Sequence, residues 1–396
     1  MPMHGRAQAL PPQSRESAET AHSGIREIAN LALLTPGAIR LEVGQPDFPT
    51  PAHVGEAAKR AIDDNWTFYT ETQGLLSLRE ALVAKLARVN GVAATPDRIT
   101  CGIGGVGVLA AAFAALVEAG DEVLLPDPAW PNFRIMCAWT HARGKSYRCP
   151  QEAGFQPDLE HLESSITPHT KLIVVNSPNN PTGVVWSRSS LERIAELAQR
   201  RGIWLLSDEC YDQILMDGRP LSPASFAPDA PIVSGFTFSK TYAMTGWRLG
   251  YAVAPAPVID TMAKVLESMC SCPPTISQKA AEAALAGPQD CVAEMNAAYR
   301  RRRDLVAGIL RAHGLLTALP EGAFYIMADI TPSGMPSREF ALSLLRERAV
   351  AVAPGSAFGA VAAGAVRVSL ASSDDQLREG VSRLCAFVRK CAEARG

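Results

Sequence analysis

Residues 234–251 read Ser-Gly-Phe-Thr-Phe-Ser-Lys-Thr-Tyr-Ala-Met-Thr-Gly-Trp-Arg-Leu-Gly-Tyr. The apolar residues 231–233 lead into this stretch and predict a strand that runs to about Phe238. Polar side chains that can bind or attack a ligand gather at the end of this strand and just beyond it: Thr237, Ser239, Lys240, Thr241 and Arg248. Hydroxyls, backbone N–H groups at a chain turn and an arginine are suited to a phosphate monoester.

Lys240 adds a second capability to this stretch. A lysine at the mouth of a sheet can lose its proton and attack a carbonyl carbon. Pyridoxal 5′-phosphate is the cofactor that needs both an anchored phosphate and a covalent bond to a lysine. The alternative is a solvated lysine, because Ser-Lys-Thr is a common sequence, so the rest of the chain has to decide between the two.

The composition is that of an ordinary globular protein with a sizeable core. The chain has 396 residues, 47% hydrophobic and 20% charged, which is enough for about two to three domains. A formal net charge of −2 predicts no nucleic-acid partner, and the basic run 300–303 is expected to be a solvated helix face. The longest uncharged run, 102–117, is short for a membrane span, so no membrane partner is expected.

The cysteines bear on metal binding and on the cellular compartment. Nine are scattered along the chain, and no His/Cys cluster surrounds the close pair Cys270 and Cys272, so no metal site is predicted. No signal peptide is recognisable, which makes reduced thiols in the cytoplasm the expectation.

Strand and helix patterns alternate regularly from Ile99 onward. Strands are expected at 122–125, 171–176, 203–207, 232–238 and 250–254. This alternation predicts an α/β fold whose large domain has a mostly parallel central sheet flanked by helices. In such sheets ligands bind beyond the carboxyl ends of the strands, so the residues that follow each strand are the candidates for a site.

Four strand ends carry chemically useful groups. One strand is followed by the amide of Asn180, and another by the carboxylate of Asp208 with the phenol of Tyr211. A third is followed by Lys240, and a fourth by the glycine-rich loop at 102–107. We expect these groups to meet at one edge of the sheet.

The pattern changes past about residue 260. Helices are expected at 256–285, 288–313, 337–348 and 373–392, with strands at 323–327 and 365–369. The sequence therefore predicts a flexible N-terminal arm at 1–20 and a large cofactor-binding domain at 49–285. Residues 21–48 are expected to form the N-terminal part of a small domain, and residues 286–396 its C-terminal α+β part. Trp66 and Phe68 are expected in the core.

The glycine-rich loop also matches a different cofactor. Residues 102–107 fit the dinucleotide fingerprint Gly-x-Gly-x-x-Gly, and Asp127 follows at the end of the next strand. A nicotinamide dehydrogenase is therefore an alternative, although it does not explain why Asn180, Asp208 and Lys240 follow their strands. A helix N-terminus with a glycine loop binds any phosphate, including a monoester.

The motifs as a set resemble the fold-type I pyridoxal-phosphate-dependent aminotransferases, the class I/II group that includes aspartate aminotransferase. The resemblance covers nearly the whole chain and rests on the order and spacing of four motifs: Asn180-Pro181-Thr182-Gly183, Asp208-Glu209-Cys210-Tyr211, Ser239-Lys240 and Gly246-Trp247-Arg248-Leu249-Gly250. It implies pyridoxal 5′-phosphate as cofactor and ping-pong transfer of an amino group between an L-amino acid and a 2-oxo acid. It also implies a homodimer with shared active sites.

The resemblance assigns the catalytic roles. Lys240 would bind the cofactor covalently and move the substrate proton, which requires an amine that is neutral part of the time. Asp208 would keep the pyridine nitrogen protonated, so that the ring can accept electrons. Tyr211 and Asn180 would hydrogen-bond the phenolic oxygen of the cofactor.

The same resemblance assigns further binding residues. The phosphate would be held by Arg248, Thr237, Ser239 and the amides near Gly105 and Val106. Trp130 would stack on the cofactor ring, and Tyr69 would reach the phosphate of the neighbouring subunit. Val106 stands near the place where some aspartate-specific relatives carry a lysine, which leaves a preference for a dicarboxylic substrate in doubt.

The substrate would be held at the other end of the site. Arg367 would grip the α-carboxylate with its fork, with Asn180 beside it, and Gly44 would close over the same substrate.

Two alternatives keep the cofactor and change the function. A lyase, such as a carbon–sulfur lyase, shares the constellation, and a non-catalytic domain of a transcriptional regulator could bind the same cofactor. The regulator reading is weakened by the absence of a basic patch or a recognisable DNA-reading segment before residue 24.

Overall fold

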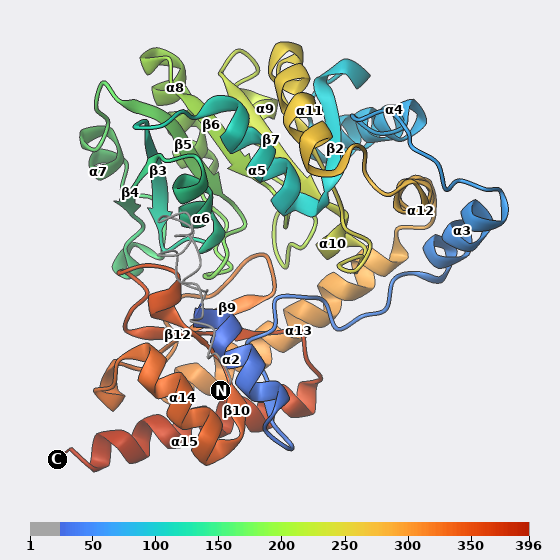
Figure 1. Ribbon diagram of the computed structural model, residues 1–396. Helices are drawn as coiled ribbons and strands as arrows, with labels where there is room; N and C mark the ends of the chain where they lie inside the picture. The colour runs from blue at the N-terminus through green and yellow to red at the C-terminus, as the bar shows by residue number, and fades with distance from the viewer. Residues whose placement is uncertain (1–23, 396) are drawn as a thin grey trace, which may run out of the picture.

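The structure is a computed structural model that describes residues 24–395. The arm predicted at 1–20 lies outside the described residues. Figure 1 shows two layered parts: a large sheet covered by helices and, below it in this view, a smaller helical part built around short strands.

A seven-stranded sheet forms the large domain, in the order β2-β8-β7-β6-β5-β3-β4. Its strands are β2 Ile99–Ile103, β3 Glu122–Asp127, β4 Arg143–Arg148, β5 Thr170–Asn176, β6 Trp204–Asp208, β7 Ile232–Thr237 and β8 Leu249–Val253. Neighbouring strands are parallel except for β8, which runs antiparallel to both β7 and β2. The predicted α/β class with a mostly parallel sheet is confirmed.

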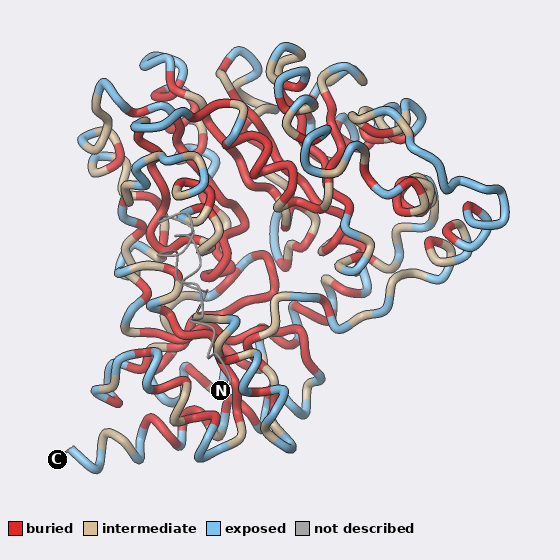
Figure 2. The backbone as a smooth tube through the Cα atoms, viewed as in Figure 1, coloured by how far each residue is buried: buried red, intermediate tan, exposed pale blue. Residues whose placement is uncertain are grey.

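The central strands are apolar on both sides because helices cover both faces of the sheet. Val174 and Leu206 pack with α5 (Gly104–Leu116) and α11 (Ala256–Cys270), whereas Ile173 and Leu205 pack with α8 (Arg188–Arg201) on the opposite face. Figure 2 shows the strands of the sheet as an almost continuous buried band. The strand β4 escaped prediction because it lies at the edge of the sheet and is largely polar and exposed.

Shorter helices complete the large domain: α3 Ala52–Asp63, α4 Leu76–Lys85, α6 Asn132–Trp139, α7 Leu159–Ser164, α9 Pro223–Phe226, α10 Phe238–Thr241 and α12 Thr275–Ala286. The single helix expected at 256–285 is in fact two, α11 and α12. Pro273 and Pro274 separate them, because proline has no N–H to continue a helix.

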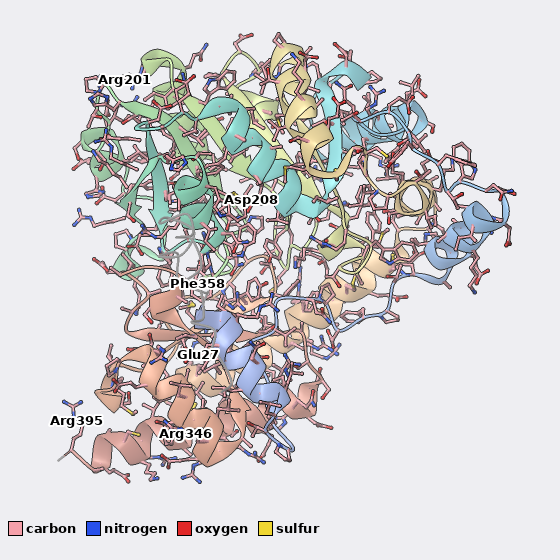
Figure 3. The ribbon with its side chains drawn as sticks, viewed as in Figure 1. Glu27, Arg201, Asp208, Arg346, Phe358 and Arg395 are labelled. Carbon is pink, nitrogen blue, oxygen red and sulfur yellow. The ribbon has the colours of Figure 1, made fainter. Side chains whose placement is uncertain are left out.

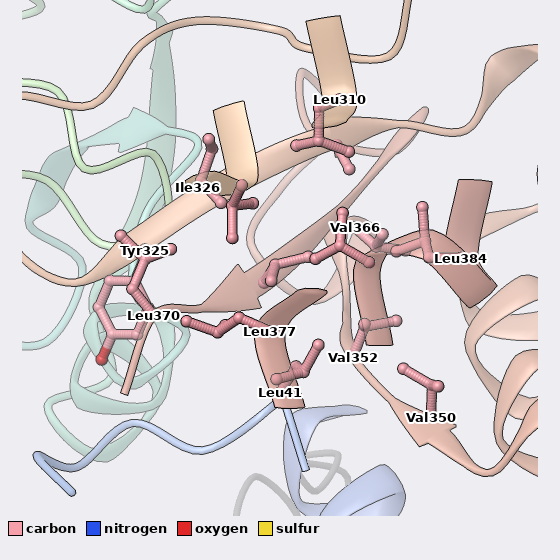
Figure 4. Packing of buried hydrophobic residues seen from close by; sticks show 14 of the residues in the cluster. Leu41, Leu310, Tyr325, Ile326, Val350, Val352, Val366, Leu370, Leu377 and Leu384 are labelled. Carbon is pink, nitrogen blue, oxygen red and sulfur yellow. The ribbon is translucent and has the colours of Figure 1, made fainter. Parts of the chain in front are cut away.

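The small domain combines both ends of the described chain. It contains α2 Gly24–Leu33, β1 Ile39–Arg40, α13 Asp290–Ala312, β9 Tyr325–Asp329, α14 Ser337–Arg348, β10 Val350–Ala351, β11 Ala353–Pro354, β12 Ala365–Ser369 and α15 Asp374–Glu393. β11, β12 and β9 form an antiparallel sheet, and β1 pairs with β10 in parallel. Figure 4 shows their aliphatic side chains packed into one cluster, with Tyr325 at its margin.

No helix within residues 24–395 is long and apolar enough to cross a membrane.

Candidate active site

The carboxyl edge of the large sheet and the small domain enclose a cavity of about 530 Å³. Figure 3 labels Asp208 on the large-domain side and Phe358 on the small-domain side of this junction. Eleven of the residues predicted from the sequence line the cavity: Gly44, Gly105, Val106, Trp130, Asn180, Asp208, Tyr211, Thr237, Ser239, Lys240 and Arg248. The expected meeting of the strand ends is thus observed.

Lys240 lies on α10, directly after β7 delivers the chain to the sheet edge. Its Nζ donates a hydrogen bond to the backbone oxygen of Gly44 at 2.6 Å. Burial lowers the pKa of Lys240 from 10.5 to about 8; the Arg367 and Arg248 charges act in the same direction, and Cys210 and Asp208 oppose them. A minor fraction of this amine is therefore neutral near physiological pH, and this fraction is much larger than in an ordinary lysine.

Asp208 is the last residue of β6, and its carboxylate is buried beneath the cavity. Oδ1 accepts the backbone N–H of Cys210 at 3.1 Å. Burial raises the pKa of Asp208, while the hydrogen bond from Cys210 and the charge of Lys240 oppose the rise. A buried carboxylate of this kind is suited to a ligand group that brings its own proton.

Asn180 and Tyr211 line the middle of the cavity. The backbone N–H of Asn180 donates to Oδ1 of Asn176 at 2.9 Å, which fixes the turn after β5. The Tyr211 hydroxyl oxygen lies 2.8 Å from that of Tyr325, and Lys240 Nζ lies 5.9 Å from the centre of the Tyr211 ring.

One end of the cavity lies where α5 begins and β7 ends, and its residues are those predicted to bind a phosphate. Thr237 Oγ1 accepts the backbone N–H of Ser239 at 3.2 Å and lies 3.0 Å from its hydroxyl. Arg248 precedes β8, and because β8 runs opposite to its neighbours, its start lies at the same sheet edge. A Cβ on Gly104 would lie 2.6 Å from Nη2 of Arg248, so glycine lets the guanidinium approach the loop.

Arg367 projects from β12 beside the cavity and is almost fully buried. Nη1 donates to Oδ1 of Asn180 at 2.9 Å, and Nη2 donates to the backbone oxygen of Glu42 at 2.7 Å. Its Nε has no hydrogen-bond partner among the described residues. Arg367 itself does not line the cavity, but it is joined to it through Asn180, which does.

Trp130 lines the cavity and packs edge-to-face against Phe133, with ring centres 5.5 Å apart. Tyr69, in contrast, does not reach the cavity of its own chain. It is 86% exposed and borders a separate hollow beside Cys272 and Pro273. The prediction that Trp66 and Phe68 are core residues is wrong, because they are 39% and 76% exposed in the same region.

Asp127, the acid of the dinucleotide fingerprint, has a structural partner. Its two carboxylate oxygens accept the backbone N–H groups of Ala360 and Val361 at 3.1 Å each, and a Cβ on Gly359 would lie 2.0 Å from Oδ1. This carboxylate therefore binds the small-domain loop rather than facing a ribose, which removes the observation that favoured a dehydrogenase.

Two residues near the catalytic groups were missed by the sequence analysis. Cys210 lines the cavity between Asp208 and Tyr211, and Tyr325 contacts both Tyr211 and Arg367. The position of Cys210 inside a recognised motif could have revealed it, whereas Tyr325 sits in an apolar strand where an aromatic residue is ordinary. Within residues 24–395 no group of three or more His, Cys, Asp or Glu side chains could hold a metal ion.

Comparison with known proteins identifies the family. The model of the family "Aminotransferase class I and II" matches residues 36–384. The chain belongs to this family. The aspartate/prephenate aminotransferase of Thermus thermophilus is 42% identical over 349 residues, which cover 87% of this chain and 89% of that protein. The probable N-acetyl-LL-diaminopimelate aminotransferase of Bacillus subtilis is 39% identical over 97% of both chains.

Solved structures agree with this assignment. An aspartate aminotransferase from Thermus thermophilus with maleate superposes with a TM-score of 0.91 at 38% identity, covering 96% of this aminotransferase and all of that chain. The chain is therefore a pyridoxal-phosphate-dependent aminotransferase, as predicted.

The residues of this aminotransferase fit the cofactor that its family uses. Lys240 offers an amine of lowered pKa, Asp208 a buried carboxylate for a protonated ring nitrogen, and Arg248 a cation for the phosphate. At the start of α5, a Cβ on Gly105 would lie 2.7 Å from Sγ of Cys210, so the glycine keeps the backbone N–H groups close to the cavity.

Proposed function

We propose that the protein works as a homodimer that moves an amino group from an L-amino acid to a 2-oxo acid by a ping-pong mechanism. The observation that supports this most is that an amine, an acid and an arginine line one cavity: Lys240, Asp208 and Arg248. A second arginine, Arg367, is hydrogen-bonded to Asn180 at the same cavity. Each group suits a different part of the reaction.

When bound, pyridoxal 5′-phosphate supplies the electron sink for the electron pair left behind when the substrate Cα loses its proton. Nζ of Lys240 accepts that proton, because an amine with a pKa of about 8 is partly neutral at the working pH. Asp208 would keep the ring nitrogen of the cofactor protonated, since a buried carboxylate stabilises a neighbouring cation. Tyr211 and Asn180, which line the cavity, would donate hydrogen bonds to the phenolic oxygen of the cofactor.

Arg367 orients the substrate. The guanidinium holds Asn180 and the backbone of Glu42, and its planar fork can hold a carboxylate by two parallel N–H bonds. Gly44 lies next to Lys240, because its backbone oxygen accepts a hydrogen bond from Lys240 Nζ. This grip places the Cα–H bond near Nζ, which converts an encounter into an intramolecular proton transfer.

Five residues would supply donors to the phosphate, and Trp130 would supply a flat apolar wall: Thr237, Ser239, Arg248, and the backbone amides of Gly105 and Val106. Val106 has an apolar side chain, so it offers no charge to a second substrate carboxylate. The relatives are named for aspartate, prephenate and N-acetyl-LL-diaminopimelate. We therefore propose an amino acid as the donor of the amino group, and kinetic measurements on different amino acids determine which side chain is preferred.

The homodimer is proposed from the surface around Tyr69. Phe68 and Tyr69 are strongly exposed and border the hollow formed with Cys272 and Pro273, and exposed aromatic groups of this kind favour a protein contact. We propose that Tyr69 completes the phosphate site of the partner subunit.

Domain limits and location complete the proposal. We place the domain boundaries at 21–48 and 286–396 for the small domain and at 49–285 for the large domain; the pairing of β1 with β10 supports joining the two small-domain parts. We further propose a role in amino-acid metabolism in the cytoplasm, which the nine free cysteines support.

The test replaces Lys240 with alanine. Lys240→Ala is expected to abolish amino transfer and to lose the borohydride-reducible bond to the cofactor, while the exposed Lys264→Ala keeps both. Near wild-type turnover in Lys240→Ala would refute the proposal. A panel of amino acids, scored by how fast each changes the absorbance of the bound cofactor, then identifies the preferred donor.

A mixing experiment tests the shared site. Tyr69→Ala and Lys240→Ala are each impaired alone, but a hybrid dimer has one site with both an intact Lys240 and an intact Tyr69. Mixing the two variants should therefore restore activity. If Tyr69 served its own subunit, mixing would restore nothing beyond the sum of the two.

A further inference from the structure

Tyr325 lies close to three residues of the site that are far apart in the sequence: Gly44, Tyr211 and Arg367. It is a buried residue of β9, which pairs with β12 so that Tyr325 lies opposite Ser369 and Met327 opposite Arg367. Figure 4 shows its ring at the margin of the small-domain core, with the hydroxyl directed away from the aliphatic side chains.

The hydroxyl of Tyr325 faces the large domain and the N-terminal segment. Its oxygen lies 2.8 Å from the Tyr211 oxygen, and a Cβ on Gly44 would lie 3.1 Å from it. Burial raises the pKa of Tyr325 and that of Tyr211, so both phenols keep their protons at neutral pH. Only one of the two protons can lie between the oxygens.

The direction of this hydrogen bond has a consequence for Tyr211. If Tyr211 donates to Tyr325, the hydroxyl proton of Tyr211 cannot form a hydrogen bond with a group in the cavity. If Tyr325 donates, the proton of Tyr211 is free for an acceptor in the cavity, and the donation it receives makes Tyr211 a stronger donor. An acceptor beside Tyr211 therefore favours the second arrangement.

The ring of Tyr325 contacts the other end of the site. The guanidinium carbon of Arg367 lies 4.2 Å from the centre of this ring and 5.0 Å from that of Phe358. Such cation–π contacts hold a guanidinium at a fixed position even before a carboxylate binds. A single side chain thus touches the residue assigned to the cofactor oxygen and the residue assigned to the substrate carboxylate.

We propose that Tyr325 is a positioning residue with two separable actions: its hydroxyl directs the proton of Tyr211 into the cavity, and its ring holds Arg367 for the substrate. The proposal rests on the proposed function, because it concerns the same cofactor and substrate.

Two substitutions separate the two actions. Tyr325→Phe removes the hydroxyl and keeps the ring, whereas Tyr325→Leu removes both. Tyr299→Phe is a matched control, because Tyr299 is a buried tyrosine of the same core whose hydroxyl has no hydrogen-bond partner among the described residues.

The first readout is the pH at which the absorbance of the lysine-bound cofactor changes. A donor on the phenolic oxygen stabilises the deprotonated form, which carries more negative charge there. Weakening that donor in Tyr325→Phe should raise the midpoint by roughly 0.3 to 1 pH unit, the size expected for one hydrogen bond. Tyr299→Phe should leave the midpoint within about 0.1 unit of wild type.

A double substitution tests whether Tyr325 acts through Tyr211. In a Tyr211→Phe background the hydroxyl of Tyr325 has lost its target, so adding Tyr325→Phe should move the midpoint by less than about 0.2 unit. An undiminished shift in that background would overturn the proposed route.

The second readout is the KM for the preferred amino donor. Tyr325→Phe should keep it within about twofold of wild type, and Tyr325→Leu should raise it by about fivefold or more, since only the latter removes the ring beneath Arg367. If Tyr325→Leu does not fold, the midpoint of Tyr325→Phe decides by itself. If the wild-type protein transaminates but the midpoint of Tyr325→Phe is unchanged, the inference about Tyr325 is overturned. If the wild-type protein does not transaminate, the proposed function is overturned instead.

Discussion

Nη1 of Arg367 donates to Oδ1 of Asn180 at 2.9 Å, across the junction between the small domain and the large domain. The two residues are 187 positions apart in the sequence. Their contact joins the arginine of β12 to the turn after β5, so the position of the guanidinium is coupled to the large domain.

Arg367→Lys is therefore expected to raise the KM for the amino acid by roughly 10- to 100-fold. A lysine offers one compact charge and cannot hold Asn180, the Glu42 backbone and two carboxylate oxygens together; losing one charged hydrogen bond has about this cost. Steady-state kinetics measures the effect, with Arg383→Lys on the exposed face of α15 as control. Equal KM values in the two variants would contradict the assignment.

The pKa of Lys240 predicts how the cofactor-free protein captures pyridoxal 5′-phosphate. The neutral amine forms the covalent bond, so the rate should rise about tenfold per pH unit below the pKa and level off above it. Because burial lowers this pKa from 10.5 to about 8, the plateau should begin near pH 8. Absorbance recorded from pH 6 to 10 measures the rate. A rate still rising steeply at pH 10 would show an ordinary lysine.

Asp208→Asn should lower kcat by roughly 10²- to 10³-fold while the cofactor remains bound. The amide is nearly the same size as the carboxylate, but it cannot stabilise a proton on the ring nitrogen as a buried negative charge does. The loss is measured from single-turnover rates, alongside the exposed Asp229→Asn. Full activity in Asp208→Asn would mean that the ring nitrogen has another partner.

Much of this site was predictable because the strands of a parallel sheet end at one edge. Asn180, Asp208 and Lys240 each follow a buried strand, so their proximity follows from topology once the alternation of strand and helix is recognised. The contact between Lys240 and Gly44 could not be predicted in this way, because it spans 196 positions and depends on how the two domains meet.

Tyr325 and β4 escaped prediction for local reasons. An aromatic residue in an apolar strand is compatible with ordinary packing, and only the position of its hydroxyl beside Tyr211 distinguishes it. β4 is polar and exposed, so it lacks the pattern of a buried strand. The exposure of Phe68 was missed because hydrophobicity alone does not distinguish a core residue from an exposed apolar one.

Gly359→Ala should loosen the contact between the two domains. Gly359 has φ +140°, which is unfavourable for other residues, and the new Cβ would lie 2.0 Å from Oδ1 of Asp127. The clash displaces the loop whose N–H groups Asp127 binds, at an expected cost of about 1–3 kcal/mol. Thermal unfolding measures it. Gly55→Ala, in an open position on α3, should cost nothing; equal midpoints for the two variants would count against the contact.

Lys85 forms a buried ion pair with Asp212 in the turn that follows β6, and Asn90 bonds to both. Lys85→Met leaves the Asp212 carboxylate buried without its cation and should cost about 3–5 kcal/mol. Lys85→Met combined with Asp212→Leu removes both charges, so it should be clearly more stable than the single variant. Denaturant midpoints measure the three proteins. Strictly additive losses would show that the two side chains do not stabilise one another, and that other contacts of Lys85, such as that of its Nζ with the Phe236 ring 4.8 Å away, account for its effect.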